Sequence, residues 1–238
     1  MSKSSSAPAI GMPVQIDPGS DRQYLSRHYS DAIAAAGGVP IVIPLISAAE
    51  FVEKLVGMLD GILLTGSNSD VDPELYHESR SDACGPVQPL RDQLDFLLLE
   101  SAFKRKIPIL AICYGIQSLN VFLGGSLVQD ISTAMNTPVR HQDCPGHEIA
   151  ISPGSILEKI AGGLKVTVNS THHQAINRPG YGLEVIAHAG DDIVESVSNT
   201  KDGYWILGVQ WHPEKSYSCD AFSRKIFDHF LARCRGAQ

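Results

Sequence analysis

The sequence lacks three features that would point to particular classes of protein. It contains no apolar stretch near the roughly 20 residues that a membrane-spanning helix needs. It contains no run of Lys or Arg, and its net charge is −7, which together disfavour a nucleic-acid partner. No CxxC motif or Cys/His cluster is present, so zinc and iron–sulfur ligation have little support. We therefore expect no membrane contact, no nucleic-acid partner and no metal.

Cysteine is scarce, and its number is odd. The five cysteines are Cys84, Cys113, Cys144, Cys219 and Cys234. An odd count without an apolar signal segment fits a reducing cytoplasm, in which thiols stay free. Residues 1–7 are Ser-rich and polar, and we expect them to form a flexible tail. The remaining residues, 8–238, suffice for one sizeable core and are few for two, so we predict a single cytoplasmic domain.

The first half of the chain alternates apolar runs with helix-like segments. Strands are predicted at Ile10–Val14, Val39–Pro44, Gly61–Thr65 and Ile107–Ile112, and helices at Tyr24–Ala36, Ala48–Met58, Arg91–Lys104 and Tyr114–Leu123. The run IPILAI that begins at Ile107 is almost wholly apolar, as expected of a central parallel strand covered on both faces. This alternation predicts a doubly wound α/β fold with right-handed crossovers and a mostly parallel sheet.

The second half contains shorter strands. They are predicted at Glu148–Ile151, Lys165–Val168, Leu183–His188, Ile193–Val197 and Trp205–Trp211, before an amphipathic helix at Tyr217–Cys234. Turns rich in Gly, Asp and Pro separate these strands. The pattern favours an antiparallel extension that then returns to the main sheet.

One cysteine lies where a nucleophile would be placed. Cys113 stands between the strand that ends at Ile112 and the helix that begins at Tyr114, which is the context of a nucleophile elbow. Gly115 supplies a small neighbour, whereas Ala111 stands where Gly is usual. A helix N-terminus stabilises a thiolate, and its free N–H groups can bind an oxyanion. The alternative is a core cysteine, since free Cys is among the most buried residue types.

A histidine and a glutamate follow another predicted strand end. His212 comes directly after Trp211, and Glu214 lies two residues further on. Sites in open α/β folds gather at the carboxyl edge of the sheet, so we expect His212 and Cys113 to meet there. Histidine exchanges protons near neutral pH, and a carboxylate that accepts from its ring fixes its orientation. The alternative is a surface turn that holds an incidental His and Glu.

These two segments resemble the class I glutamine amidotransferase family, whose signature pairs a Cys-Tyr-Gly elbow with a downstream His-Pro-Glu. Further stretches resemble its peptidase C26 branch, which includes gamma-glutamyl-gamma-aminobutyrate hydrolase. They are Asp60–Ser67, Asp70–Pro73 with Tyr76, Arg91–Asp92 with Asp95, Gly124–Leu127 with Gln129–Ile131, and Val168–Gln174. The resemblance spans nearly the whole chain. It implies a flavodoxin-like, doubly wound, mostly parallel sheet with an antiparallel extension, as in class I glutamine amidotransferases.

The resemblance also implies roles for individual residues. The matching residues are Cys113, His212 and Glu214 for catalysis, the backbone N–H groups of Gly66 and Tyr114 for the oxyanion, and Ser67, Gln117, Ser170 and His172 for substrate binding. The loop 66–70 departs from the family's run of consecutive glycines. The alternative for His172 and His173 is a polar loop with structural hydrogen bonds. Arg91, Asp92 and Asp95 are expected to form an ion network on a helix face.

The function implied is a cysteine hydrolase that cleaves the γ-glutamyl amide bond of a small substrate such as γ-glutamyl-GABA. The reaction would pass through a γ-glutamyl thioester on Cys113 and requires no cofactor. Such an enzyme would act in polyamine and putrescine degradation. Two alternatives stay open: a glutaminase subunit that delivers ammonia to a partner synthase, and a catalytically silent ligand-binding protein of the same fold. We expect a homodimer, because symmetric dimers are the commonest oligomers of soluble proteins.

Overall fold

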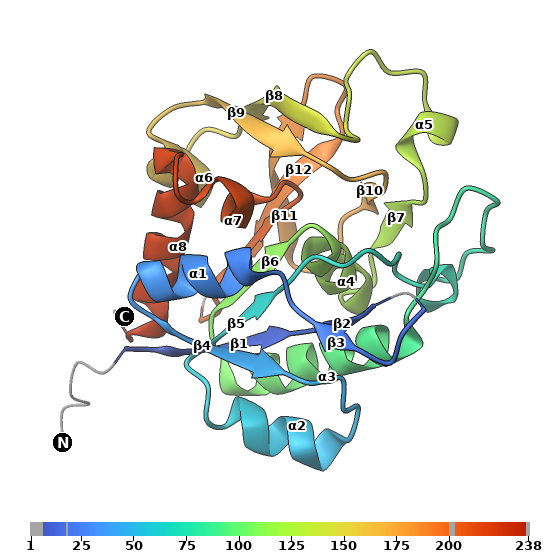
Figure 1. Cartoon of the computed structure of the whole chain (residues 1–238). Helices are drawn as coiled ribbons and strands as arrows, with labels where there is room; N and C mark the ends of the chain where they lie inside the picture. The colour runs from blue at the N-terminus through green and yellow to red at the C-terminus, as the bar shows by residue number, and fades with distance from the viewer. Residues whose placement is uncertain (1–6, 18, 200–202, 237–238) are drawn as a thin grey trace.

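A nine-stranded sheet forms the centre of the computed structural model, which describes residues 7–17, 19–199 and 203–236 (Figure 1). Its strands, in spatial order, are β4 (Val39–Ile43), β1 (Ala9–Pro13), β5 (Gly61–Leu64), β6 (Ile109–Ile112), β13 (Ile206–Val209), β12 (Val194–Asn199), β11 (Leu183–Ala189), β8 (Cys144–Ile151) and β9 (Lys165–Ser170). The strands from β4 to β13 are parallel and follow the flavodoxin-like order 2-1-3-4-5. The strands from β12 to β9 are antiparallel. The predicted fold class is confirmed.

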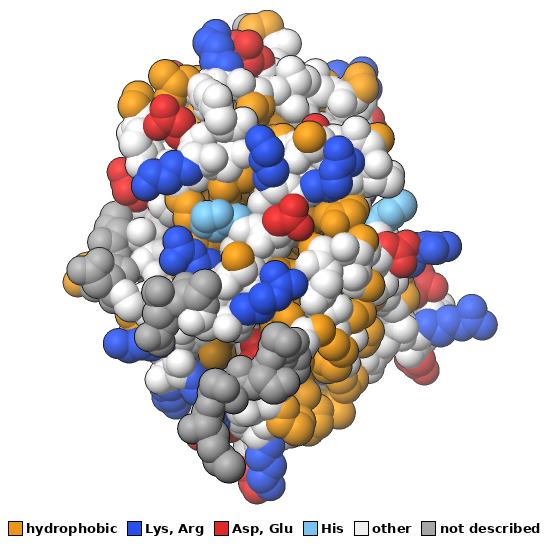
Figure 2. All heavy atoms as spheres, turned by 90° about the vertical axis from the view of Figure 1, so that its left-hand side faces the viewer, with side chains coloured by type: hydrophobic (Ala, Val, Ile, Leu, Met, Phe, Trp, Pro, Cys, Tyr) orange, Lys and Arg blue, Asp and Glu red, His pale blue; other side chains and the backbone are white. Residues whose placement is uncertain are grey.

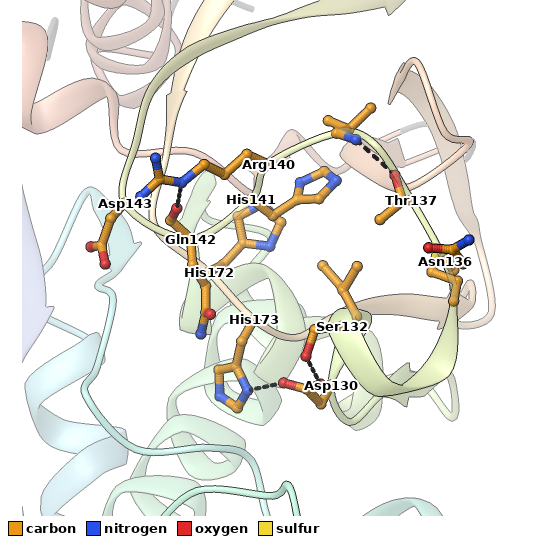
Figure 3. Close-up of a pocket in the computed structure, with 13 residues that line it drawn as sticks. Asp130, Ser132, Asn136, Thr137, Arg140, His141, Gln142, Asp143, His172 and His173 are labelled. Atoms are coloured by element: carbon orange, nitrogen blue, oxygen red, sulfur yellow. Dashed lines mark hydrogen bonds and ion pairs between the residues drawn. The ribbon is translucent and has the colours of Figure 1, made fainter.

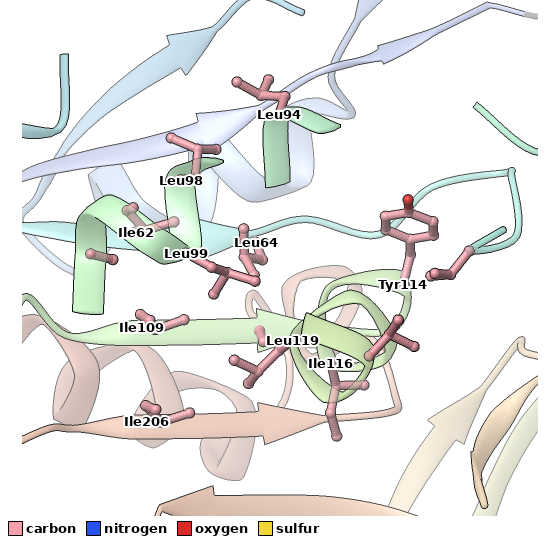
Figure 4. Close-up of a cluster of buried hydrophobic side chains, with 14 of the residues drawn as sticks. Ile62, Leu64, Leu94, Leu98, Leu99, Ile109, Tyr114, Ile116, Leu119 and Ile206 are labelled. Atoms are coloured by element: carbon pink, nitrogen blue, oxygen red, sulfur yellow. The ribbon is translucent and has the colours of Figure 1, made fainter. Parts of the chain in front are cut away.

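Helices cover both faces of the parallel strands. On one face lie α2 (Ala49–Val56), α3 (Pro89–Arg105) and α4 (Tyr114–Phe122), and on the other lie α1 (Arg27–Ala35), α6 (Ile156–Ala161) and α8 (Ala221–Cys234). Along β5 the side chains alternate, since Ile62 and Leu64 face α3 and α4 (Figure 4), whereas Leu63 faces the opposite layer. This burial on both faces explains why the sequences of the parallel strands are unbroken apolar runs.

Two predicted helices begin later than expected. The segment Tyr24–Ala36 becomes helical only at Arg27, because Gln23–Tyr24 (β3) pairs with Gln15–Ile16 (β2) in a small antiparallel ladder. The closing segment contains α7 (Pro213–Ser216) and then α8, which starts after Asp220. The Asp220 carboxylate accepts hydrogen bonds from two backbone N–H groups at the start of α8. Such a cap sets the helix boundary.

Several short elements of the structure were not predicted from the sequence. They are β7 (Ser126–Val128), β10 (Ala175–Arg178), α5 (Ile131–Ala134), α6 and the 3₁₀ turn Pro73–Tyr76. The strands β7 and β10 pair with each other in an antiparallel ladder. This pairing ties the chain after α4 to the chain after β9, so the segment 171–174 is brought beside the nucleophile turn.

The predicted tail, residues 1–7, lies outside the described residues except for Ala7. The single-domain boundary at residue 8 stays a prediction. Among the described helices, none is long and apolar enough to cross a bilayer. On the face over α1, α6 and α8, Lys and Arg side chains stand apart, with acidic side chains among them (Figure 2).

Candidate active site

Cys113 occupies a strained turn between β6 and α4. Its backbone has φ 53° and ψ −109°, a region that non-glycine residues rarely adopt and that costs on the order of 1–3 kcal/mol. A Cβ at Gly115 would lie 2.3 Å from the carbonyl oxygen of Leu64, so only glycine lets α4 pass this close to β5. Ala111, which replaces the usual glycine of the motif, is accommodated in the core. The structure therefore contains the predicted elbow.

His212 lies immediately before α7, at the carboxyl edge of β13. Its ring Nδ1 is 2.7 Å from Oε1 of Glu214, and both side chains are buried. Asn169 of β9 holds the His212 backbone from both sides: its side-chain oxygen accepts from the His212 N–H at 2.9 Å, and its amide donates to the His212 carbonyl at 2.8 Å. Asn169, from the antiparallel extension, thus positions His212, which follows the parallel strand β13.

The charges around His212 favour its protonated form. Burial alone would lower the pKa of His212, but the charges of Glu214 and Cys113, with hydrogen bonds to both, raise this pKa to about 10. The imidazole therefore interacts with the charges of both Glu214 and Cys113. A histidine in this position can exchange a proton with the sulfur and with a leaving group.

The loop after β5 reaches the same point. A Cβ at Gly66 would lie 3.2 Å from Cε1 of His212 and 2.8 Å from the hydroxyl of Tyr29, so glycine permits this approach. The N–H of Gly66 donates to the Tyr29 hydroxyl at 2.9 Å. Gly66 can therefore serve an oxyanion only if this N–H leaves Tyr29, and its role stays a prediction. Tyr114 N–H occupies the first position of α4, where no earlier helical turn supplies a carbonyl, and its role also stays a prediction.

Tyr29 of α1 is a site residue that the sequence did not reveal. Burial raises the pKa of Tyr29 well above its ordinary value, and the charges of Glu214 and Cys113 raise it further. The phenol therefore stays neutral beside the charged groups. In the sequence, Tyr29 has the spacing of an ordinary buried residue of an amphipathic helix. The residues around it do not predict its contacts with Gly66 and Glu214.

A hollow of about 200 Å³ opens beside Cys113. Its walls come from the loop after β5, the start of α4 and the segment 171–174, and include Ser67, Gln117 and His172. Ser170 does not line this hollow; its hydroxyl donates to the carbonyl of His141 at 2.7 Å. The structure thus brings three of the four predicted substrate-binding residues to Cys113 and gives Ser170 a contact within the fold.

A second hollow, of about 390 Å³, adjoins the first and shares His172 and His173 with it (Figure 3). The ring of His173 bridges two carboxylates, with Nε2 2.8 Å from Asp70 and Nδ1 3.2 Å from Asp130. The hydrogen bond to Asp70 raises the pKa of His173. These contacts agree with the structural alternative for His173.

The predicted ion network of α3 is present, and it is buried. Arg91 and Asp95 form an ion pair with an N–O distance of 2.8 Å, and both side chains are fully buried. Arg91 lies over the ring of Tyr114, whose hydroxyl donates to Asp92. The network is buried because α3 packs against the sheet and α4 together, which leaves these charges no path to solvent. The network supports the turn that follows Cys113.

Asp92 gives stability a dependence on pH that can be measured. Burial, and then the charge of Asp95, raise the pKa of Asp92 from 3.8 to about 7, although the bond from Tyr114 lowers it. Between these values the unfolded chain has released a proton that the folded chain keeps, so stability falls as pH rises through this window. Full ionisation costs roughly 4 kcal/mol. In urea unfolding, Asp92→Asn should match wild type near pH 4 and be the more stable protein at pH 8. A difference that does not vary with pH would contradict this assignment.

Comparisons with known proteins agree with this geometry. A family model for peptidase C26 matches residues 10–214. Gamma-glutamyl-gamma-aminobutyrate hydrolase of Escherichia coli is 37% identical over 224 residues, which cover 90% of this chain and 87% of that protein. The glutamine amidotransferase-like protein YvdE of Lactococcus lactis is 34% identical over 213 residues, which cover 87% of each.

Solved structures show the same architecture. A protein of Thermoplasma acidophilum described as one of the subunits of GMP synthase superposes with a TM-score of 0.66 at 18% identity, over 97% of this chain and 95% of that one. A glutamine amidotransferase of Methylobacillus flagellatus gives a TM-score of 0.59 at 15% identity, over 88% and 71%. The fold is that of class I glutamine amidotransferases, and the family match and the hydrolase relatives support an amide hydrolase. The chain therefore belongs to the peptidase C26 family.

Proposed function

We propose that this protein is a cysteine hydrolase of small γ-glutamyl amides. The observation that carries the proposal is the strained turn of Cys113 beside His212, whose raised pKa reflects the charges of Glu214 and Cys113 and whose ring is backed by Glu214 at 2.7 Å. A buried structural cysteine would need neither the strain nor a buried charged partner. The 37% identity to a γ-glutamyl-GABA hydrolase supports the γ-glutamyl class of substrate.

The proposed reaction has two halves. With the thiol proton held by His212, the Cys113 sulfur attacks the γ-carbonyl carbon, and the N–H of Tyr114, with that of Gly66 once released from Tyr29, holds the oxyanion. His212 donates its proton to the departing amine, which leaves a γ-glutamyl thioester on Cys113. His212 then takes a proton from water, which attacks the thioester. The carbon–sulfur bond then breaks, glutamate is released, and the Cys113 sulfur again has its proton on His212, while Glu214 keeps the ring in one orientation throughout.

The hollow beside Cys113 suits a small and polar acyl group. Its volume of about 200 Å³ falls below the usual range for drug-sized ligands. Hydroxyl and amide side chains, among them Ser67 and Gln117, line it together with Asp70. An ammonium group and a carboxylate, which a glutamyl group carries at its α-carbon, would find partners there. The amine half of the substrate would extend toward the larger adjoining hollow.

A second candidate is a glutaminase that delivers ammonia to a separate synthase, since several relatives are named as glutamine amidotransferase-like proteins. Both candidates use the same nucleophile and differ in the amine that is released. γ-Glutamyl-GABA hydrolysis by the isolated chain would place the protein in polyamine degradation, whereas glutamine hydrolysis that needs a partner would not.

The test is release of glutamate from γ-glutamyl-GABA, a γ-glutamyl dipeptide and free glutamine by the purified chain. We expect turnover of γ-glutamyl-GABA or the dipeptide, together with a γ-glutamyl adduct on the Cys113 peptide in quenched samples. Turnover of glutamine alone would favour the glutaminase. Silence on all three substrates, with no adduct, would favour the ligand-binding protein and overturn the proposal.

A further inference from the structure

Four ionisable side chains meet behind the wall that separates the two hollows. Glu195 of β12 is fully buried, and one of its carboxylate oxygens lies close to an imidazole nitrogen from each of three histidines. The distances to Oε1 are 3.5 Å from His141 Nδ1, 3.0 Å from His147 Nε2 and 3.5 Å from His172 Nε2. Each of the three rings is at least nine-tenths buried. Figure 3 shows His141 and His172 in the wall of the larger hollow.

The outer nitrogen of each ring is fixed by an acceptor. Nδ1 of His172 lies 2.9 Å from the carbonyl of Gln174, and Nδ1 of His147 lies 3.4 Å from the carbonyl of Arg140. Nε2 of His141 lies 3.0 Å from the carboxylate of Asp191. Carbonyl and carboxylate oxygens accept hydrogen bonds, so the outer nitrogen of each ring carries a hydrogen.

The inner nitrogens therefore direct lone pairs at Glu195 when the rings are neutral. Among the described residues, no well-aligned hydrogen bond reaches these nitrogens or either carboxylate oxygen of Glu195. Three lone pairs and a carboxylate that face one another in a buried space repel unless a cation lies between them. The same pattern, in which the outer nitrogen donates to a carboxylate or carbonyl, orients histidines that bind metals.

The spacing of His141, His147 and Glu195 also fits one metal ion. Ligand atoms about 2.0–2.1 Å from a tetrahedral zinc ion stand about 3.3 Å from one another. The observed separations of 3.0 and 3.5 Å from Glu195 Oε1 bracket that value. The ligand atoms of His141, His147 and Glu195 all lie within 4.8 Å of one another.

We propose that these side chains form a binding site for a divalent transition metal of the zinc class. His141 Nδ1, His147 Nε2 and Glu195 supply the three ligands, whereas His172 Nε2, 3.5 Å from Glu195, lies outside this group. Imidazole nitrogens with one carboxylate suit zinc, and are poor ligands for magnesium or calcium, which prefer oxygen. The site would overturn the expectation from the sequence that the protein holds no metal.

The position of the site assigns it a structural role. The ligands come from the loop 136–143, from β8 and from β12, so one ion would join three separate stretches of chain. His172 lines the hollow beside Cys113 and lies 3.5 Å from Glu195, so the metal would act on that wall through Glu195. Cys113 attack and His212 proton transfer proceed without it.

The first test measures zinc binding in the absence of substrate, so its outcome is independent of the proposed hydrolysis. Untagged Cys113→Ala protein is stripped with a chelator and titrated with zinc against a competing indicator, because Cys113 and His212 could themselves bind zinc. We expect about one equivalent per chain, an increase in the thermal unfolding temperature, and a tetrahedral visible spectrum with cobalt. Uptake below about 0.1 equivalent, with no thermal shift, would overturn the proposal because a site this buried should hold its ion tightly.

Single-residue variants then test whether the zinc ion binds at these side chains. His147→Gln, at the most accessible ligand, should abolish tight uptake, whereas His188→Gln, at a half-buried histidine of the same sheet outside the cluster, should leave it unchanged. Asp191→Asn, which alters the partner of His141, should weaken zinc affinity about 10-fold. Equal uptake by the His147 and His188 variants would show that zinc binds elsewhere and would overturn the assignment. Circular dichroism of each protein separates loss of binding from loss of folding.

Discussion

Cys113→Ala is expected to lower kcat/KM for a γ-glutamyl amide by at least about 10⁴-fold, because it removes the atom to which the acyl group is transferred. Cys113→Ser should lose nearly as much, since a hydroxyl is far harder to deprotonate than a thiol. His212→Asn should have an effect of similar size. The double variant Cys113→Ala/His212→Asn should be no worse than either single one, because residues that act as one unit are not additive.

The matched control is Cys219→Ala, which removes an exposed free thiol and should leave kcat/KM within about 2-fold of wild type. Iodoacetamide gives a second readout, because Cys113 in wild type should react faster than Cys219 despite its burial, and His212→Asn should remove this advantage. A kcat/KM for Cys113→Ala equal to that of wild type would contradict the proposed mechanism. Equal losses in the Cys113 and Cys219 variants would point to a structural cause.

The parts of the fold that depend on local pattern were predictable. The parallel strands carry unbroken apolar runs because both faces are covered, and those runs located β1, β4, β5 and β6. The small ladder of β2 with β3, and that of β7 with β10, escaped prediction because each strand is too short to show a period. The start of α8 was misplaced because the Asp220 cap and the separate turn α7 interrupt one apolar pattern.

The site residues that depend on local sequence pattern were also predictable, and those that depend on contacts between distant residues were not. Cys113 and His212 could be found because each follows a strand end, and parallel strands place their carboxyl ends at one edge. Tyr29, Asn169 and the burial of Arg91 could not, because each depends on contacts between residues far apart in the chain. The ligands proposed for zinc are scattered from His141 to Glu195 on three stretches of chain, with none of the short spacings by which metal sites are usually recognised.

Arg91→Met is expected to destabilise the protein by about 3–5 kcal/mol, because it leaves the buried carboxylate of Asp95 without its partner. It also removes the donors to two carbonyls, that of Thr65 at 2.6 Å and that of Val14 at 3.3 Å. Urea unfolding measures the loss. The matched control is Arg27→Met, which breaks another Arg–Asp pair at the same i,i+4 spacing but in solvent, and should cost less than about 1 kcal/mol.

The double variant Arg91→Met/Asp95→Leu separates stability from positioning. Replacing both charges by apolar side chains removes the unpaired carboxylate, so most of the lost stability should return, although the carbonyl of Thr65 still lacks its donor. The kcat for hydrolysis, which Arg91→Met should also lower, should not recover in the double variant. Thr65, which precedes Gly66, still lacks its donor, and the ring of Tyr114, next to Cys113, has lost the guanidinium that lies 4.9 Å from its centroid. If stability and kcat recover together, Arg91 serves the fold alone. If Arg91→Met costs no more than Arg27→Met, the buried ion pair is not what holds α3 against the elbow.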